Sequence, residues 1–114
     1  MQALLAGELD VIVSSVTTLV TSRLAGADTI MIQTLVPTFV DHIVSLSSIT
    51  DLRQLIGKTG GVNRSGSTSD LGLRLALRQV GINPEKDTNI ITAGDAPTRL
   101  AAMSRGFLQF DNHA

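Results

Sequence analysis

The chain has 114 residues, which is enough for one domain but too few for two of ordinary size. Its 43% apolar and 17% charged residues are typical of a globular protein. A net charge of −1 and the absence of Tyr and Trp argue against a nucleic-acid-binding protein, and the absence of Cys excludes disulfides, a thiol nucleophile and a zinc-thiolate site.

The first part of the chain alternates predicted helices and strands. They are a helix over Gln2–Ala6 that stops at Gly7, a strand over Leu9–Val13, a helix from Val16 to about Ala25, and a strand over Asp28–Val36. Ser14 or Ser15 is expected to cap the second helix, whose apolar residues recur on one face.

The same alternation resumes after Pro37. The predicted elements are an extended segment over Phe39–Leu46, a short helical turn over Thr50–Gly57, strands over Lys58–Asn63, Thr88–Thr92 and Phe107–Phe110, helices over Ser67–Val80 and from Gly94 through Met103, and a polar tail over Asp111–Ala114. Leu71, Leu75 and Val80 are expected to face inward. This alternation predicts an α/β fold of three layers with mostly parallel strands.

The turn that precedes the Ser67–Val80 helix carries the main candidate site. Gly66 allows a left-handed backbone, Ser67 is suited to cap the helix, and Asp70 is a shorter version of the capping-box Glu. The free N–H groups and the positive end of the helix dipole suit an anionic or strongly polar group. An ordinary capped helix with nothing bound explains the same residues equally well.

Three further motifs each have a functional and a simpler structural explanation. The stretch Gly61–Gly66 has the glycine spacing of a phosphate-binding loop, but Ser67 stands where the lysine is expected, which argues against a nucleoside triphosphatase. Ser14 and Ser15 follow one predicted strand and Asp95 follows another, where ligands bind in open α/β sheets. Each of the three is also a plausible helix cap.

The catalytic inventory is small. His42 and His113, the only histidines, lie far apart in the sequence without metal-ligand spacing, and no serine lies in a nucleophile elbow. We therefore expect no enzyme activity and no cofactor.

No apolar stretch approaches the ~18 residues of a membrane span. Residues 1–8 lack the basic start and apolar core of a signal peptide, so the chain expressed alone is expected in the cytoplasm.

Six stretches form an ordered set of landmarks over residues 2 to about 110. They are Ala3–Val11, Gly26–Asp28, Ile49–Thr59, Arg64–Asp70, Gly81–Asp87 and Gly94–Met103. In order and spacing they resemble the substrate-binding proteins of ABC importers, of the aliphatic sulfonate, taurine and nitrate type that also includes thiamine-pyrimidine binders.

This resemblance implies a periplasmic binding protein type II-like fold with a ligand between two lobes. It assigns residues 1–37 to part of the first lobe, 38–49 to a crossover or hinge, and 50–114 to part of the second lobe. The candidate ligand-binding residues are Ser14, Ser15, Arg64, Ser65, Gly66, Ser67, Thr68 and Asp95. Family members are longer, periplasmic and served by an ABC permease, so the chain is expected to be an internal piece that self-associates to cover exposed sheet edges.

Three functions stay open from the sequence. The first is a solute-binding protein, or a piece of one, for a small anionic or polar organic ligand such as a sulfonate. The second is a non-catalytic α/β module that self-associates and has lost its transport function. The third is an enzyme of the thiamine-pyrimidine branch, against which the absence of cysteine argues.

Overall fold

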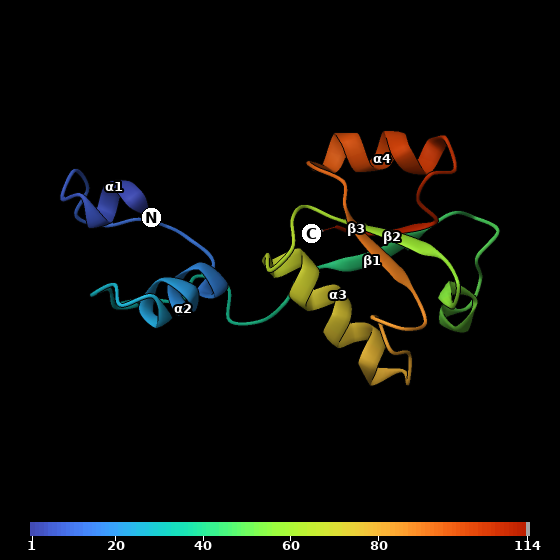
Figure 1. Cartoon of the computed structure of the whole chain (residues 1–114), viewed down its shortest axis with the longest axis horizontal. Coiled ribbons are helices and arrows are strands. Elements are labelled where there is room, and N and C mark those ends of the chain that lie inside the picture. The colour runs from blue at the N-terminus through green and yellow to red at the C-terminus, as the bar shows by residue number, and fades with distance from the viewer. Residues whose placement is uncertain (114) are drawn as a thin grey trace. The chain divides into compact units, whose positions relative to one another are not determined.

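The computed structural model describes residues 1–113, which divide into two compact units between Thr38 and Phe39 (Figure 1). The first unit contains α1 (Gln2–Leu5) and α2 (Val16–Leu24). The predicted helix ends are confirmed here: the backbone turns left-handed at Gly7 after α1 and at Gly26 after α2.

The two strands predicted in this first unit are wrong. Leu9–Val13 and Asp28–Val36 belong to no strand, and the four strands of the structure all lie after residue 38. Two strands alone have too little apolar surface to form a stable sheet. The predicted apolar face of α2 is likewise mostly uncovered: Val16, Val20 and Leu24 are 54%, 50% and 85% exposed, and Leu19 is partly buried.

The second unit is built on a sheet of four strands in the order β1-β4-β2-β3. Their bounds are β1 His42–Ser45, β2 Thr59–Val62, β3 Asn89–Thr92 and β4 Phe110–His113. β2 pairs in parallel with both β3 and β4, whereas β1 pairs antiparallel with β4. The sheet is therefore mixed but mostly parallel, as the alternation of helices and strands predicted.

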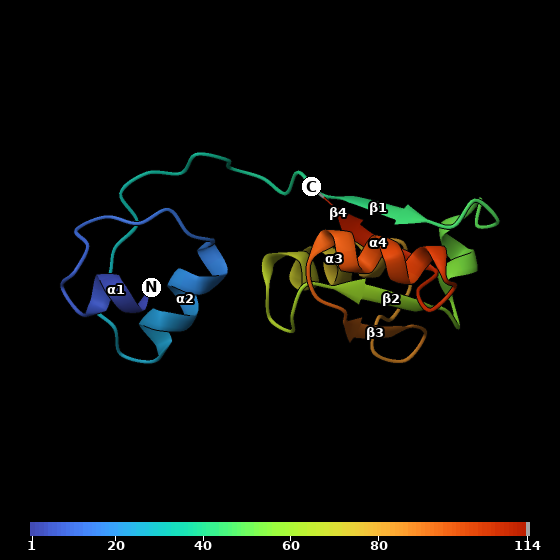
Figure 2. The same ribbon diagram turned by 90° about the horizontal axis from the view of Figure 1, so that it is seen from above.

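Helices cover both faces of this sheet. Figure 1 shows α3 (Thr68–Gln79) on one side and α4 (Ala96–Ser104) on the other, and Figure 2 views the same arrangement from above. The short 3₁₀ helix η1 (Leu52–Leu55) precedes β2. The second unit therefore has the three layers expected from the sequence.

The apolar core lies between α3 and the sheet. Its fully packed members are Leu55, Val62, Leu73, Leu77, Ile82 and Phe110. The predicted inward face of α3 was partly wrong, because Leu71 and Leu75 are exposed while Val80 is partly buried against the core. Both leucine pairs have the same i,i+4 spacing, so the sequence pattern did not distinguish the buried pair from the exposed one.

The last strand lies later in the chain than predicted. β4 begins at Phe110, and Asp111 and Asn112, predicted as part of a polar tail, are 0% and 3% exposed. The Phe110 ring lies against β2, because a Cβ added at Gly60 would stand 2.3 Å from its Cε2 atom. Ala114, the end of the predicted tail, is outside the described residues.

Candidate functional site

Three parallel strands end at one edge of the sheet. β2, β3 and β4 run in the same direction, so their carboxyl ends meet there. The turn over residues 63–67 follows β2, residues 93–95 follow β3, and His113 closes β4. In open α/β sheets this is the edge where ligands bind. It gathers the predicted residues Arg64–Thr68 and Asp95.

The turn before α3 is held by hydrogen bonds within itself. Gly66 has a φ of +78°, a left-handed conformation that glycine adopts without strain. Ser67 is the N-cap, and its Oγ accepts from the Asp70 amide at 3.3 Å. The Asp70 carboxylate accepts from the Gly66 amide at 2.8 Å, one residue earlier than the predicted capping box requires.

Asp70 already places one negative charge at this helix end. Its carboxylate is buried, and Arg74 neutralises it through a hydrogen bond from Nε to Oδ1 at 2.6 Å. An incoming anion therefore meets a helix terminus whose dipole is partly compensated. The turn is less positive than its sequence suggested.

Several donors at the turn remain available to a ligand. Within residues 1–113 no hydrogen bond occupies the backbone N–H of Ser65 or of Ser69, and the exposed Arg64 side chain has no ion pair or hydrogen bond. The hydroxyls of Ser67 and Ser69 lie 2.9 Å apart. Backbone amides, paired hydroxyls and one cation together suit a small group with several acceptor oxygens.

Asp95 caps α4 at the same edge. Its Oδ1 accepts from the Thr98 amide at 3.0 Å. Hydrogen bonds from the Thr98 side chain and then from its backbone N–H lower the pKa of Asp95, so the exposed carboxylate keeps its charge to a lower pH than an ordinary aspartate. A fixed negative charge repels an anion, so Asp95 suits the polar or cationic part of a ligand better than its acid group.

A buried polar cluster, which the sequence reading missed, lies beneath this edge. Arg99 is 5% exposed and donates from Nε to Asp111 Oδ1 at 2.7 Å, and His113 Nε2 lies 2.6 Å from Asp111 Oδ2. His42 stands opposite His113 in the pairing of β1 with β4. The only signal in the sequence was a strand running directly into three polar residues, which we interpreted as the end of the fold.

Ser14 and Ser15 belong to the first unit. Ser15 is the N-cap of α2, and its Oγ accepts from the Thr18 amide at 3.3 Å. That Oγ also lies 2.9 Å from the hydroxyls of Thr17 and Thr18. Ser14, which directly precedes Ser15 in the sequence, is exposed.

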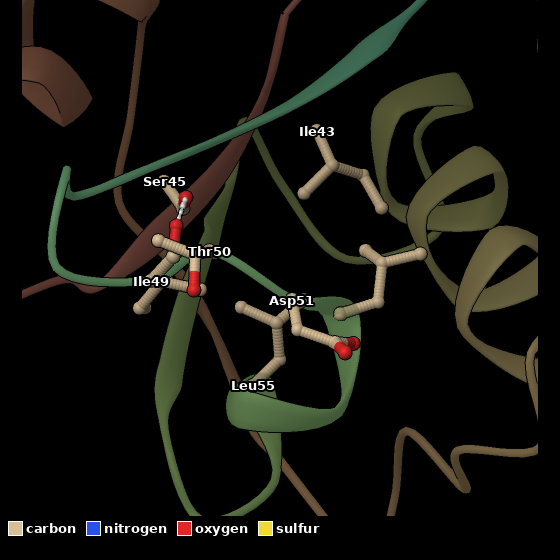
Figure 3. Close-up of a pocket in the computed structure, with 7 residues that line it drawn as sticks. Ile43, Ser45, Ile49, Thr50, Asp51 and Leu55 are labelled. Carbon is tan, nitrogen blue, oxygen red and sulfur yellow. Dashed lines mark hydrogen bonds between the residues drawn. The ribbon is translucent and has the colours of Figure 1, made fainter.

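A small open hollow lies at the other edge of the sheet, where β1 ends and η1 precedes β2 (Figure 3). Its lining residues are Ile43, Ser45, Ile49, Thr50, Asp51, Leu52 and Leu55. Its volume of about 170 Å³ is below the ~300 Å³ at which ligand pockets usually begin. None of the candidate residues lines it.

Among residues 1–113, no three His, Asp or Glu side chains are arranged to hold a metal ion. No helix described by the structure is long and apolar enough to cross a membrane.

Comparison with known proteins gives one family. The sequence profile of the family described as NMT1/THI5 like matches residues 1–107. Searches of curated proteins and of solved structures gave no significant match.

Proposed function

Because the chain belongs to the NMT1/THI5-like family of ABC substrate-binding proteins, we propose that it is a solute-binding component, or a piece of one, that recognises a small anionic or polar organic ligand. The family match over residues 1–107 supports a binding role, and the α/β sheet with helices on both faces agrees with the type II-like fold that the family implies. We propose that residues 1–37 and 50–114 are parts of the two lobes and that 38–49 cross between them.

The observation that carries the proposed ligand class is the turn before α3. The unused backbone amides of Ser65 and Ser69, the Ser67 hydroxyl and the exposed Arg64 side chain provide donors, and the one carboxylate at the turn, that of Asp70, is paired with Arg74. A sulfonate presents three acceptor oxygens, which match this arrangement. We include Gly66 and Thr68 in the site as the backbone of the turn, and Asp95 as a contributor from the start of α4. Ser14 and Ser15 are proposed separately, as ligand-contacting residues of the first unit.

The proposal extends to the setting of the whole protein. Family members are typically periplasmic and deliver solute to an ABC permease, and we propose the same compartment and partner for the full-length protein. Although the THI5 members of the family are enzymes, we propose that this chain is non-catalytic, because it contains no cysteine and no nucleophile elbow.

The test is a ligand panel read by thermal unfolding, with taurine, an alkyl sulfonate, nitrate, bicarbonate and a pyrimidine. A ligand that binds only the folded chain raises the melting temperature. At a ligand concentration of 100 times its Kd, the free energy of unfolding increases by about 2.7 kcal/mol. Arg64→Gln is expected to reduce the shift. Arg105→Gln, the same change at an exposed arginine that follows α4, serves as the matched control. No shift with any ligand at millimolar concentration would contradict the proposal.

A second candidate function is a self-associating module without transport function. It is favoured by the first unit, where residues 1–38 bury no apolar side chain. A segment of this size rarely supplies its own core and commonly relies on oligomerisation. Light scattering on the samples of the ligand panel separates the two: an oligomer that binds none of the ligands supports the module, and a chain that binds one supports the solute-binding role.

A further inference from the structure

Asn112 connects two parts of the second unit that are far apart in the sequence. Its side chain is buried in β4, and Nδ2 donates to the Ser69 carbonyl at 2.8 Å and to Asp41 Oδ2 at 3.2 Å. Ser69 lies in the first turn of α3, and Asp41 immediately precedes β1. One amide group therefore holds the start of α3 and the residues before β1 together.

Close packing at Gly72 brings the same two parts into contact. A Cβ added at Gly72 would stand 3.2 Å from Phe39 Cδ1 and 3.4 Å from Asp41 Oδ2. Distances this short leave little room for a side chain at position 72. The segment Phe39–Asp41 therefore packs directly against the beginning of α3.

Ser69 also contacts both ends of the candidate binding turn. Its Oγ accepts from the Asn63 amide at 3.3 Å and lies 2.9 Å from Ser67 Oγ, the cap of α3. A displacement of the Ser69 backbone therefore changes both ends of the turn, including the two amides that are free to bind a ligand.

We propose that Asn112 is a positioning residue that couples the segment preceding β1 to the binding turn of α3. It holds Asp41 and Ser69 at fixed distance, so the geometry of the donors at Ser65–Ser69 depends on the segment Phe39–Asp41. This inference rests on the proposed function in one respect, that the turn binds the ligand.

The residue types at the contact fit this role. The side-chain amide of Asn112 has two N–H groups, which match its two acceptors, Asp41 Oδ2 and the Ser69 carbonyl. The backbone N–H of Asn112 donates to Asp111 Oδ1 at 2.7 Å. An aspartate at position 112 would lose both side-chain donors and place a carboxylate against that of Asp41. The interaction therefore requires the side-chain amide of asparagine, and an aspartate of similar shape cannot replace it.

Amide hydrogen exchange of the full chain tests the coupling. Asp41→Ala is expected to speed exchange of the Gly66, Asp70 and Leu71 amides about five- to tenfold, because the partly buried hydrogen bond from Asn112 to Asp41 is lost. Exchange of the Ile82 amide, which lies just beyond the C-terminal end of α3 and donates to the Leu77 carbonyl, is expected to stay unchanged. Asp10→Ala is the control, since Asp10 is exposed and makes no contact of this kind within residues 1–113.

Conservative and reversed variants separate positioning from general destabilisation. Asp41→Asn keeps an acceptor and is expected to show normal exchange at the start of α3. Asn112→Asp is expected to speed exchange of the same amides more than Asp41→Ala does. The proposal is overturned if the amides at the start of α3 exchange at the same rate in Asp41→Ala as in the control. It is also overturned if Asp41→Ala speeds exchange of the Ile82 amide by the same factor.

Titration with taurine and sulfate completes the test. Asp41→Ala is expected to weaken binding about tenfold relative to Asp10→Ala. Equal affinity in these two variants would overturn the positioning role. If the unmodified chain binds neither probe while the exchange coupling is present, the proposed function fails and the positioning role stands.

Discussion

Replacing Arg99 by Met tests whether the buried charges at the end of the chain hold the fold together. The guanidinium donates to Asp111 Oδ1 at 2.7 Å, to the Gly94 carbonyl at 2.7 Å and to the Asn112 carbonyl at 3.1 Å. Without it, the fully buried Asp111 carboxylate keeps only its contacts with His113 and the Asn112 amide.

The expected loss is large for a chain of this size. Breaking a buried ion pair by removing one partner costs about 3–5 kcal/mol, because the remaining charge stays uncompensated. The total stability of a small protein is about 5–15 kcal/mol. Arg99→Met should therefore remove a substantial part of it and leave the chain partly unfolded near 37 °C.

Urea unfolding followed by circular dichroism measures this loss. The midpoint should fall, with the slope unchanged if the unfolded state is unaffected. Arg105→Met, at an exposed position just after α4, is the control and should change stability by less than about 0.5 kcal/mol. The double variant Arg99→Met, Asp111→Leu should recover much of the loss, because no unpaired charge remains. A loss in Arg99→Met as small as that of the control, below about 0.5 kcal/mol, would show that the buried pair of Arg99 and Asp111 does not hold the fold together.

Three further variants test other parts of the structure. Ser67→Ala removes the cap of α3 and should cost about 1 kcal/mol, which lowers the melting temperature by several degrees in a thermal scan; no change would contradict the cap. Gly60→Ala places a methyl group 2.3 Å from the Phe110 ring and should destabilise by about 1–3 kcal/mol in urea, and combining it with Phe110→Leu should cost less than the sum. Because the folded pKa of Asp95 is lowered, its contribution is present above the unfolded pKa of about 3.9 and is lost as pH falls through the folded value; stability measured from pH 6 to pH 2 should fall less steeply in Asp95→Asn, and identical curves would contradict the lowered pKa.

Local signals in the sequence predicted the helix ends well. Ser15, Ser67 and Asp95 each cap a helix as expected, and Gly66 takes the left-handed conformation that its turn requires. These features depend on a few neighbouring residues, so a single sequence contains the information needed to place them.

Features that depend on tertiary contacts could not be predicted in the same way. Asp111 and Asn112 lie in a buried strand because Arg99 pairs with the Asp111 carboxylate and because Asp41 and Ser69 accept from the Asn112 amide. Those partners lie 12 to 71 residues away in the chain. Apolar Leu9–Val13 forms no strand, because strand formation depends on available neighbours as much as on the composition of the segment.

The candidate site shows the same division. The turn at Arg64–Thr68 was located from glycine and capping signals, whereas the compensation of the helix end by Asp70 and Arg74 became visible only with side-chain geometry. The role of Asn112 had no sequence signal, because an asparagine after a predicted final strand is usually solvated.

The most direct test of the solute-binding role is a titration of the ¹⁵N-labelled chain with taurine, followed through its amide resonances. If the turn binds the ligand, saturable shifts are expected to concentrate at Ser65 to Ser69, where the unused amide donors lie. Saturable shifts confined to the opposite edge of the sheet, around Ile43 and Leu55, or no shifts at millimolar taurine with an equally silent sulfate control, would contradict that role.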